Sequence, residues 1–335
     1  MSGATQFYLT TVLVYLGVDV LACWALNLEL GVTGVLNFAF VVFQAAGAYT
    51  AAVLTLGPDS GNGGFQQYIG GFTLPYPLPL LAAGLVGAVI SAPVGLVALR
   101  RLRSDYQAVA MLVVSVIATT VATNDVGLVN GSAGLTLIPA PFSNHFGGQA
   151  STQYQWFYVV LTAIVCLIIY LFLHRITGSP LGRALRAVRD NEQAAAALGK
   201  NVLGLRILSF VIGNVIAAIS GAVLVQFIGA WAPSGWLFPE TFVFLAAIII
   251  GGLGNNFGAI VGALVLPVGL SEATRLLPPF GRPGLIEALQ WVVIGSLILL
   301  FLWFWPQGIV PERKRRFGRP SGQRPLVLRL LRPAR

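Results

Sequence analysis

Long apolar stretches, separated by short polar breaks, run through almost the whole chain. The stretches cover residues 7–28, 33–56, 76–99, 106–129, 156–173, 207–229, 242–268 and 289–305. A helix needs about 20 predominantly apolar residues to cross the hydrocarbon core of a bilayer, and most of these stretches approach that length. They predict an all-α, polytopic helical membrane protein with about eight to ten transmembrane or half-membrane helices, some of them broken at Gly-rich segments.

The composition agrees with the pattern. Of 335 residues, 56% are hydrophobic and only 9% are charged. A soluble domain carries about 25% charged residues. So few polar groups cannot cover a globular surface, and a soluble fold is excluded.

Basic residues divide the polar breaks into two classes. Lys and Arg concentrate in residues 100–105, 175–206 and 312–335, whereas 57–75, 130–155 and 230–241 hold hardly any charge. Because Lys and Arg mark the cytoplasmic side, the first three are predicted inside and the other three outside, with the N-terminus outside and the C-terminus inside.

The last segment separates from the rest by charge. We expect a transmembrane permease domain over 1–311 and a basic cytoplasmic tail over 312–335, which carries nine basic residues and one acidic residue. Behind such a membrane body, a basic tail indicates proximity to anionic lipid rather than to nucleic acid.

Glycine interrupts two of the apolar stretches. The stretch 242–268 has to enter and return, yet it is too short for two full spans, and Gly251, Gly252, Gly254, Asn255 and Asn256 break its middle. Two half-helices forming a hairpin are therefore predicted, with a weaker break of similar composition at 31–34. Paired Gly-interrupted segments point to a transport pathway; the alternative is that glycine only permits close helix packing.

Residues 175–206 form the most informative polar segment. Ser179 suits a helix N-cap and Pro180 the first helical position, and Gly199 is a natural stop. One short helix is predicted, with same-face pairs of Arg186 with Asp190 and of Arg189 with Glu192. Held between two spans, it favours docking to a protein partner; the alternative is a helix lying on the bilayer surface.

The same segment resembles a known family. Ser179-Pro-Leu-Gly-Arg-Ala-Leu-Arg-Ala-Val-Arg-Asp-Asn-Glu192, followed by Ala-Ala-Leu-Gly199, is similar to the cytoplasmic loop of the permease subunits of branched-chain amino-acid ABC importers. Further similarities are Gly34-Val-Leu-Asn37-Phe-Ala with Gly47-Ala-Tyr49, Ile250-Gly-Gly-Leu-Gly254-Asn with Gly258 and Gly262, and Trp305-Pro-Gln-Gly308-Ile. The resemblance covers almost the whole chain, and the family includes permeases assigned to urea and short amides.

The resemblance implies an assembly. Its parts are a second permease subunit in a heterodimer, two cytoplasmic ATPase subunits and an extracytoplasmic substrate-binding protein. The residues that it assigns to ATPase coupling are Ser179, Gly182, Arg183, Arg186, Arg189, Glu192 and Gly199. The chain has no phosphate-loop motif, so ATP and Mg are expected on the partners and no cofactor on this chain, which is not an enzyme.

Polar groups inside the apolar stretches are candidates for the translocation path. The candidates are Asn37, Gln44, Asn124, Asn214, Gly251, Gly252 and Gly254. Such groups can contact a small polar solute, or they can form hydrogen bonds between helices. Asp19 and Asp125 leave the same alternatives open, with exposure at the interface a further one for Asp125. No catalytic group stands out, and neither Cys23 and Cys166 nor the two lone histidines show metal spacing.

These observations predict the membrane-spanning permease subunit of an ATP-driven importer in the bacterial inner membrane, which works by alternating access driven by the partner ATPases and serves branched-chain amino acids. The same machinery for urea or short amides is one alternative. An ion-coupled secondary transporter, with Asp19 or Asp125 as the coupling group, is another.

Overall fold

The computed structural model describes residues 3–58, 66–102, 104–276 and 285–312, so most of the predicted basic tail and Arg103 lie outside the described residues. The elements are α1 Gly3–Leu26, η1 Asn27–Val32, α2 Phe40–Leu56, α3 Leu78–Arg101, α4 Ser104–Asn124, α5 Val126–Val129, η3 Gly131–Ala133, η4 Ser143–Phe146, α6 Thr152–Gly178, α7 Pro180–Asp190, α8 Glu192–Ala197, α9 Val202–Ile228, η5 Pro233–Gly235, α10 Pro239–Gly251, α11 Asn256–Ala263, η6 Leu264–Val268, α12 Gly269–Leu276 and α13 Leu285–Phe304.

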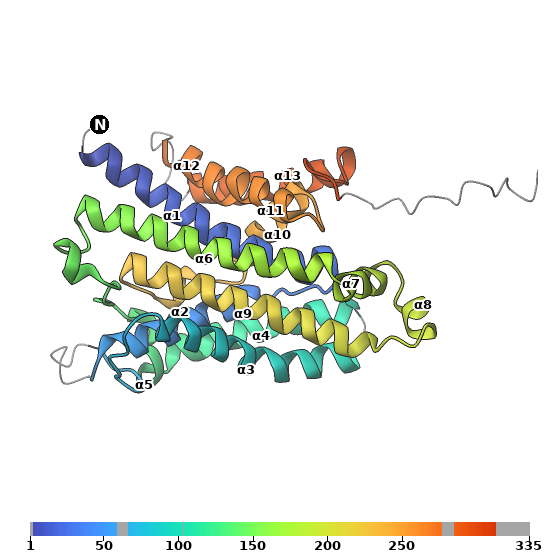
Figure 1. The fold of residues 1–335 in the computed structure, drawn as a ribbon, viewed down its shortest axis with the longest axis horizontal. Helices are drawn as coiled ribbons and strands as arrows, with labels where there is room; N and C mark the ends of the chain where they lie inside the picture. Colours follow the sequence, from blue (N-terminus) through green and yellow to red (C-terminus); the bar gives the residue numbers. More distant parts are fainter. Residues whose placement is uncertain (1–2, 59–65, 103, 277–284, 313–335) are drawn as a thin grey trace, which may run out of the picture.

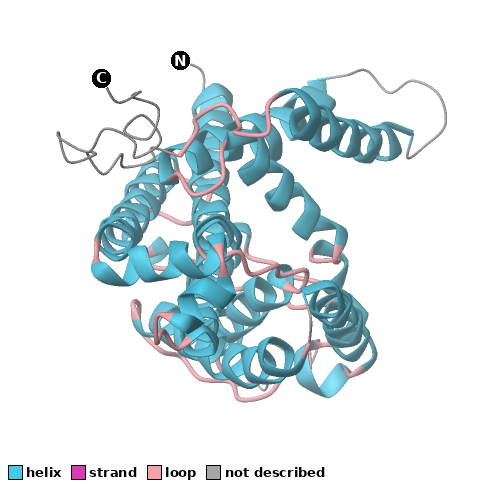
Figure 2. Cartoon of the chain, turned by 90° about the vertical axis from the view of Figure 1, so that its right-hand side faces the viewer, coloured by secondary structure: helices cyan, strands magenta, loops and turns pink. Residues whose placement is uncertain are grey.

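The long helices lie side by side along the longest axis of the molecule, and the connections gather at its two ends (Figure 1). Among the described residues, seven helices are long and apolar enough to cross a membrane, and Phe40–Leu56 and Ala288–Phe304 are shorter apolar helices. In the described ranges the β structure is limited to two isolated bridges. The predicted all-α, polytopic fold is confirmed. Figure 2, which views the bundle along its length, shows many of the helices nearly end-on.

The core of the bundle is built around α2 and α9. Their backbones approach so closely that a Cβ atom at Gly47 would collide with the backbone of Ala218, and one at Gly221 with the carbonyl of Gln44. Small residues allow such approach between membrane helices. Gln44 donates a hydrogen bond to the Ser220 hydroxyl across this contact, at 3.2 Å.

The predicted hairpin is confirmed at its break but not in the length of its arms. Residues 252–255, here named the Gly254 break, separate α10 from α11, with Gly252 and Gly254 in the left-handed region at φ +123° and +78°. The arms are not half-helices, because Pro233–Gly251 and Asn256–Arg275 are each long and apolar enough to span a membrane.

Polar contacts explain why the second arm extends beyond the apolar stretch. The Tyr8 hydroxyl of α1 donates to Glu272 at 2.7 Å, and the Arg275 guanidinium lies 5.4 Å from the centre of the Tyr8 ring. Both charged residues therefore have a partner on α1 and continue the helix as α12. The apolar pattern alone ends the arm too early.

The weaker break near the start of the chain is also confirmed. Helix α1 widens into the π-helical turn η1, and the chain then runs without regular helix until α2 begins at Phe40. Residues 27–39 are here named the Gly31 break. π-helical turns inside helices occur frequently at functional sites.

The close contact of α2 with α9 gives a stability prediction. Gly221→Val should destabilise the protein by about 1–3 kcal/mol or more, because the added atoms meet backbone that cannot move aside. A lowered midpoint in thermal unfolding of the detergent-purified protein checks this. Gly295→Val is the matched control, since a Cβ atom there meets nothing within 4 Å; equal midpoints for both variants would contradict the contact.

Candidate functional site: a helix pair that joins two helix breaks

Helices α7 and α8, here named the linker helices, lie at one end of the bundle (Figure 1). The Ser179 hydroxyl accepts hydrogen bonds from the amides of Leu181 at 3.2 Å and Gly182 at 3.4 Å, and Pro180 is the first helical residue. The predicted N-cap is confirmed. The prediction of one helix is wrong: Asn191 is extended at φ −160° and caps α8 through the Ala194 amide at 2.9 Å.

The two faces of the linker helices differ in what they contact. Gly182, Leu185 and Val188 are buried against the bundle. Arg183, Ala187 and Asp190, spaced by one helical turn, are exposed. Beyond α8, Leu198 is an apolar side chain that is 81% exposed, and Gly199 ends the element at φ +76°. The outer face is therefore free to contact another molecule.

Two arginines of α7 turn toward the bundle and share one carboxylate. Arg186 Nε lies 2.9 Å from Glu312 Oε1, and Arg189 Nη2 lies 2.8 Å from Glu312 Oε2. All three side chains are less than one-third exposed. The ion pairs fasten α7 to the segment that follows α13.

The predicted pairs within the linker helices are wrong. Arg189 contacts the adjacent Asp190 at 3.3 Å instead of Glu192, while Glu192 pairs with Arg206 of α9 at 2.9 Å. The extended Asn191 breaks the helical spacing on which the predicted Arg189–Glu192 pair depended. Arg186 pairs with Glu312, which is too distant in sequence for a helix-spacing rule to find.

Arg189 also reaches the Gly31 break. Its Nη1 donates to the Gly31 carbonyl oxygen. A second chain of contacts ends at the same break: Arg206 donates to Gln107 Oε1 at 2.8 Å, and Gln107 Nε2 donates to the Leu36 carbonyl at 3.0 Å. Because Glu192 of α8 forms an ion pair with Arg206, this second chain of contacts also starts in the linker helices.

The Gly31 break and the Gly254 break meet through asparagine side chains. Asn27 Oδ1 accepts from the Gly254 amide at 2.8 Å, and Asn27 Nδ2 donates to Asn256 Oδ1 at 3.2 Å. The chain after α13 packs beside the Gly254 break, since the Ile309 amide donates to the Ile250 carbonyl at 2.8 Å and the Val310 amide to the Gly251 carbonyl at 2.9 Å. The predicted path glycines 251, 252 and 254 therefore lie at the junction of both breaks.

A second polar cluster lies inside the bundle. Asn37 Nδ2 donates to Glu29 Oε2 at 2.8 Å and to Asn214 Oδ1 at 3.0 Å, and all three residues are fully buried. Glu29 Oε1 and Asn214 Nδ2 have no hydrogen-bond partner within the described ranges. Polar groups at this depth are costly and mark functional sites by default.

The predicted path residues fall into separate places. Asn37 and Asn214 are brought together. Gln44 forms a hydrogen bond with Ser220 at a separate contact between α2 and α9. Asn124 lies exposed at the end of α4, where it donates to the Thr120 carbonyl at 2.8 Å. Asn124 is thus apart from the buried cluster. Of the acidic candidates, Asp125 caps α5 through the Gly127 amide at 3.0 Å.

Several site residues were missed by sequence reasoning. Asn27 and Glu29 carry a signal in retrospect, because they are polar residues at the end of an apolar stretch and lie four and two residues before Gly31. Glu312 is the only acidic residue of the basic tail. Across the described residues, no group of His, Cys, Asp or Glu side chains is arranged to hold a metal ion.

The ion pairs to Glu312 give a testable prediction. Glu312→Gln should speed hydrogen exchange of the backbone amides of residues 180–190 about tenfold or more, because a hydrogen bond to a charged group contributes about 1.5–3 kcal/mol. Mass-spectrometric exchange on the purified protein measures it. Arg183→Gln, on the exposed face of the same helix, should leave the rates unchanged, and equal exchange in all three proteins would contradict the anchoring role.

Comparisons of the sequence with known proteins point to one family. A family model described as the permease component of the branched-chain amino acid transport system matches residues 8–302. No solved structure matches the chain.

Named relatives are similar over most of their length. The high-affinity branched-chain amino acid transport system permease protein LivM of Salmonella typhimurium is 28% identical over 89% of this chain and 69% of its own. LivH of Escherichia coli K12, a permease protein of the same description, is 29% identical over 87% and 88%. BraD of Pseudomonas aeruginosa is 28% identical over 87% and 88%.

The match covers nearly the whole helical bundle, including the linker helices and both breaks. Members of this family are non-catalytic, multi-pass membrane subunits. The chain belongs to the family of permease components of branched-chain amino acid transport systems.

Proposed function

We propose that the chain is one of two membrane-spanning subunits of an ATP-driven importer, and that its solute is a branched-chain amino acid. The observation that carries the proposal is the pair of linker helices: one face is exposed, and the other binds the Gly31 break through Arg189 and the segment after α13 through Arg186 and Arg189. The solute is supported by the names of the relatives, all of which are branched-chain amino acid permeases.

The proposed partners follow from what this chain lacks and what it exposes. Two ATPase subunits bind ATP and Mg in the cytoplasm and dock on the linker helices, and a second permease subunit completes the path. A substrate-binding protein delivers solute at the opposite end of the bundle. The cell membrane surrounds the body, and anionic lipid attracts the basic tail.

The contacts suggest how motion passes from the ATPases to the path. When ATP closes the partner subunits, they move the linker helices. Arg189 pulls on Gly31, and Glu312 transmits the same displacement to the chain after α13. Because Asn27 ties the Gly31 break to the Gly254 break, both move together and the path changes sides. Packed elements of this kind switch between discrete arrangements.

The structure suggests two roles within the predicted coupling residues. Arg183, Glu192 and Gly199 are exposed and suit contact with the ATPase. Gly182, Arg186 and Arg189 face the bundle and suit transmission, while Ser179 fixes the start of α7. Leu198 adds the apolar side chain that a docking surface needs at its centre.

Docking can be tested at Leu198. Leu198→Glu should abolish co-purification of the cognate ATPase without affecting membrane insertion, since burying a carboxylate in an interface is strongly unfavourable. Leu137→Glu is the matched control, because Leu137 is 78% exposed at the opposite end of the bundle. Retention of the ATPase by the Leu198 variant would refute docking at this position.

Orientation can be tested by cysteine labelling of intact cells, with Cys23 and Cys166 replaced by Ala. A cysteine at exposed Ala150 should react with a membrane-impermeant maleimide, and one at exposed Ala197 should react only after permeabilisation. This is the outcome expected from the positive-inside rule. The reverse pattern would overturn the orientation and, with it, the coupling role of the linker helices.

The function itself is tested in proteoliposomes that contain the permease pair, the ATPases encoded beside it and the binding protein. Radiolabelled leucine should accumulate with ATP and fail to accumulate when the ATPase is inactivated by mutation of its phosphate loop. Uptake of urea or acetamide but not leucine would select the amide alternative. Uptake driven by an ion gradient without ATP would refute the proposal.

A further inference from the structure

Asp19 of α1 is an acidic residue inside a membrane span that takes no part in the contacts of the linker helices. It lies near the middle of the span Thr5–Val32 and is partly exposed. Among the described residues its carboxylate has no ion-pair or hydrogen-bond partner. A charged group at this depth is costly in hydrocarbon, and acidic residues within membrane spans face protein or water. Asp19 therefore needs surroundings other than lipid.

Helix geometry places Asp19 on the side of α1 that points away from α6. Gly17 packs against α6, where an added Cβ atom would collide with the Thr162 side chain. With 3.6 residues per turn, Asp19 lies about 200° around the helix from Gly17, on the opposite side. Tyr15, four residues before Asp19, shares its face. The two residues form one strip of α1.

Neighbouring helices touch this strip without covering it. The Tyr15 ring meets the Phe227 ring of α9 edge-on, with the ring centroids 6.3 Å apart. Two turns earlier in α1, Tyr8 donates to Glu272 of α12 at 2.7 Å. Tyr15 is nevertheless 37% exposed. The strip therefore stays open beside α9.

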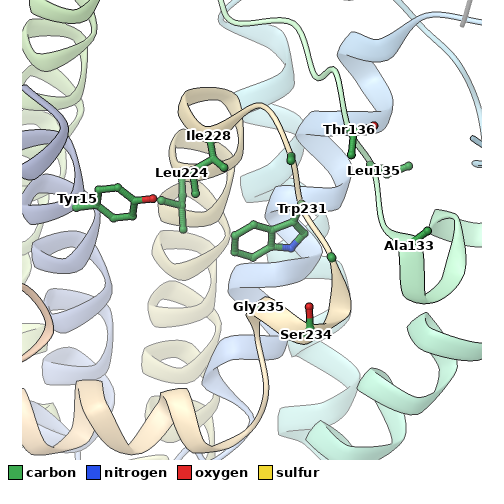
Figure 3. Close-up of a pocket in the computed structure, with 11 residues that line it drawn as sticks. Tyr15, Ala133, Leu135, Thr136, Leu224, Ile228, Trp231, Ser234 and Gly235 are labelled. Carbon is green, nitrogen blue, oxygen red and sulfur yellow. The ribbon is translucent and has the colours of Figure 1, made fainter. Parts of the chain in front are cut away.

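A hollow of about 380 Å³ adjoins the strip. Tyr15 reaches from α1 toward Leu224 and Ile228 of α9, which line the hollow together with Trp231 of the following loop (Figure 3). Most of the lining is aliphatic or aromatic, as in the core of a protein interface. Tyr15, Asp19, Leu224 and Ile228 are here named the Asp19 face.

Main-chain pairing fixes the loops beside the hollow. The Leu135 amide donates to the Trp231 carbonyl at 2.8 Å, and the Trp231 amide donates to the Leu135 carbonyl at 2.7 Å. A surface that is already ordered loses less conformational freedom when a partner binds. The hollow is therefore preformed for contact.

The exposed faces of α3 and α6 have a different character. Leu85 and Val89 of α3 and Ile164 and Ile168 of α6 are each more than half exposed. Neither helix carries a charged residue in its middle. Apolar faces of this kind suit lipid tails. The Asp19 face is thus distinguished from them by an unsatisfied charge.

We infer that a helix of the second permease subunit packs against the Asp19 face. That helix supplies a hydrogen-bond donor to Asp19 at mid-membrane depth, and apolar side chains to the hollow beside Tyr15. Because an unsatisfied carboxylate disfavours an all-apolar neighbour, Asp19 also selects which membrane helix can pair here. The inference rests on the proposed function, whose second membrane-spanning subunit it places.

Site-specific photo-crosslinking tests which face meets the second permease. p-Benzoylphenylalanine is introduced at Tyr15 or Ile228 in cells that produce the complete transporter, and the membranes are irradiated. Each position should give an adduct with the second permease, identified by mass spectrometry. Leu85 and Ile168, which are more exposed, are the matched controls and should give none. Absence of the adduct at both test positions, equal yields at the controls, or adducts only with a second copy of this chain would overturn the inference.

Co-purification provides the second measurement. Asp19→Leu should lower the amount of second permease that co-purifies with this chain about tenfold or more, because a hydrogen bond to a charged group is lost. Asp19→Asn, which can still accept a hydrogen bond, should lose less. Asp125→Asn, which can still accept from the Gly127 amide, is the control and should behave as the unmodified chain does. Recovery with Asp19→Leu within twofold of this control would contradict the assignment.

The two failures can be told apart. If no second permease co-purifies with the unmodified chain, the proposed two-subunit importer fails, and the face assignment fails with it. If the second permease co-purifies but crosslinks only from Leu85 or Ile168, the proposed function stands and the face assignment alone fails.

Discussion

Backbone groups freed at a buried helix break have no water to bind, and this constraint governs the end of the bundle that carries the linker helices. Every amide and carbonyl freed at a break must find a partner within the protein. Here Asn27 supplies an acceptor for the Gly254 amide, and Arg189 supplies a donor for the Gly31 carbonyl. The residues that make the breaks tolerable are therefore also the residues that join them to the linker helices.

This dual role explains the distribution of charge on α7. On a helix that only bound a partner, the arginines would be expected on the exposed face. Instead Arg186 and Arg189 lie against Glu312, and only Arg183 remains outside. The outer face carries Arg183, Ala187 and Asp190 on α7 and, beyond α8, the apolar Leu198. Anchoring and docking thus use opposite faces of one short element, as expected of a part that transmits displacement.

Patterns along the chain predict the local features well and the long-range ones poorly. Helices, both breaks, the Ser179 cap and the Gly199 stop depend on neighbouring residues, and they were predicted. The ion pairs to Glu312 and the hydrogen bond from Asn27 to the Gly254 break connect residues more than 100 positions apart, so no spacing rule reports them. Glu29 escaped because it lies at the end of an apolar stretch, where a polar residue usually marks the membrane surface; the structure buries it beside Asn37.

The loop after η3 and the loop after α9 are joined through amides and carbonyls of Leu135 and Trp231, not through their side chains. Main-chain pairing is indifferent to which residue occupies a position, provided that the residue is not proline. The pairing can therefore persist while the side chains around it change. In descendants of this chain, substitutions in these two loops can accumulate without loss of the scaffold that holds them together.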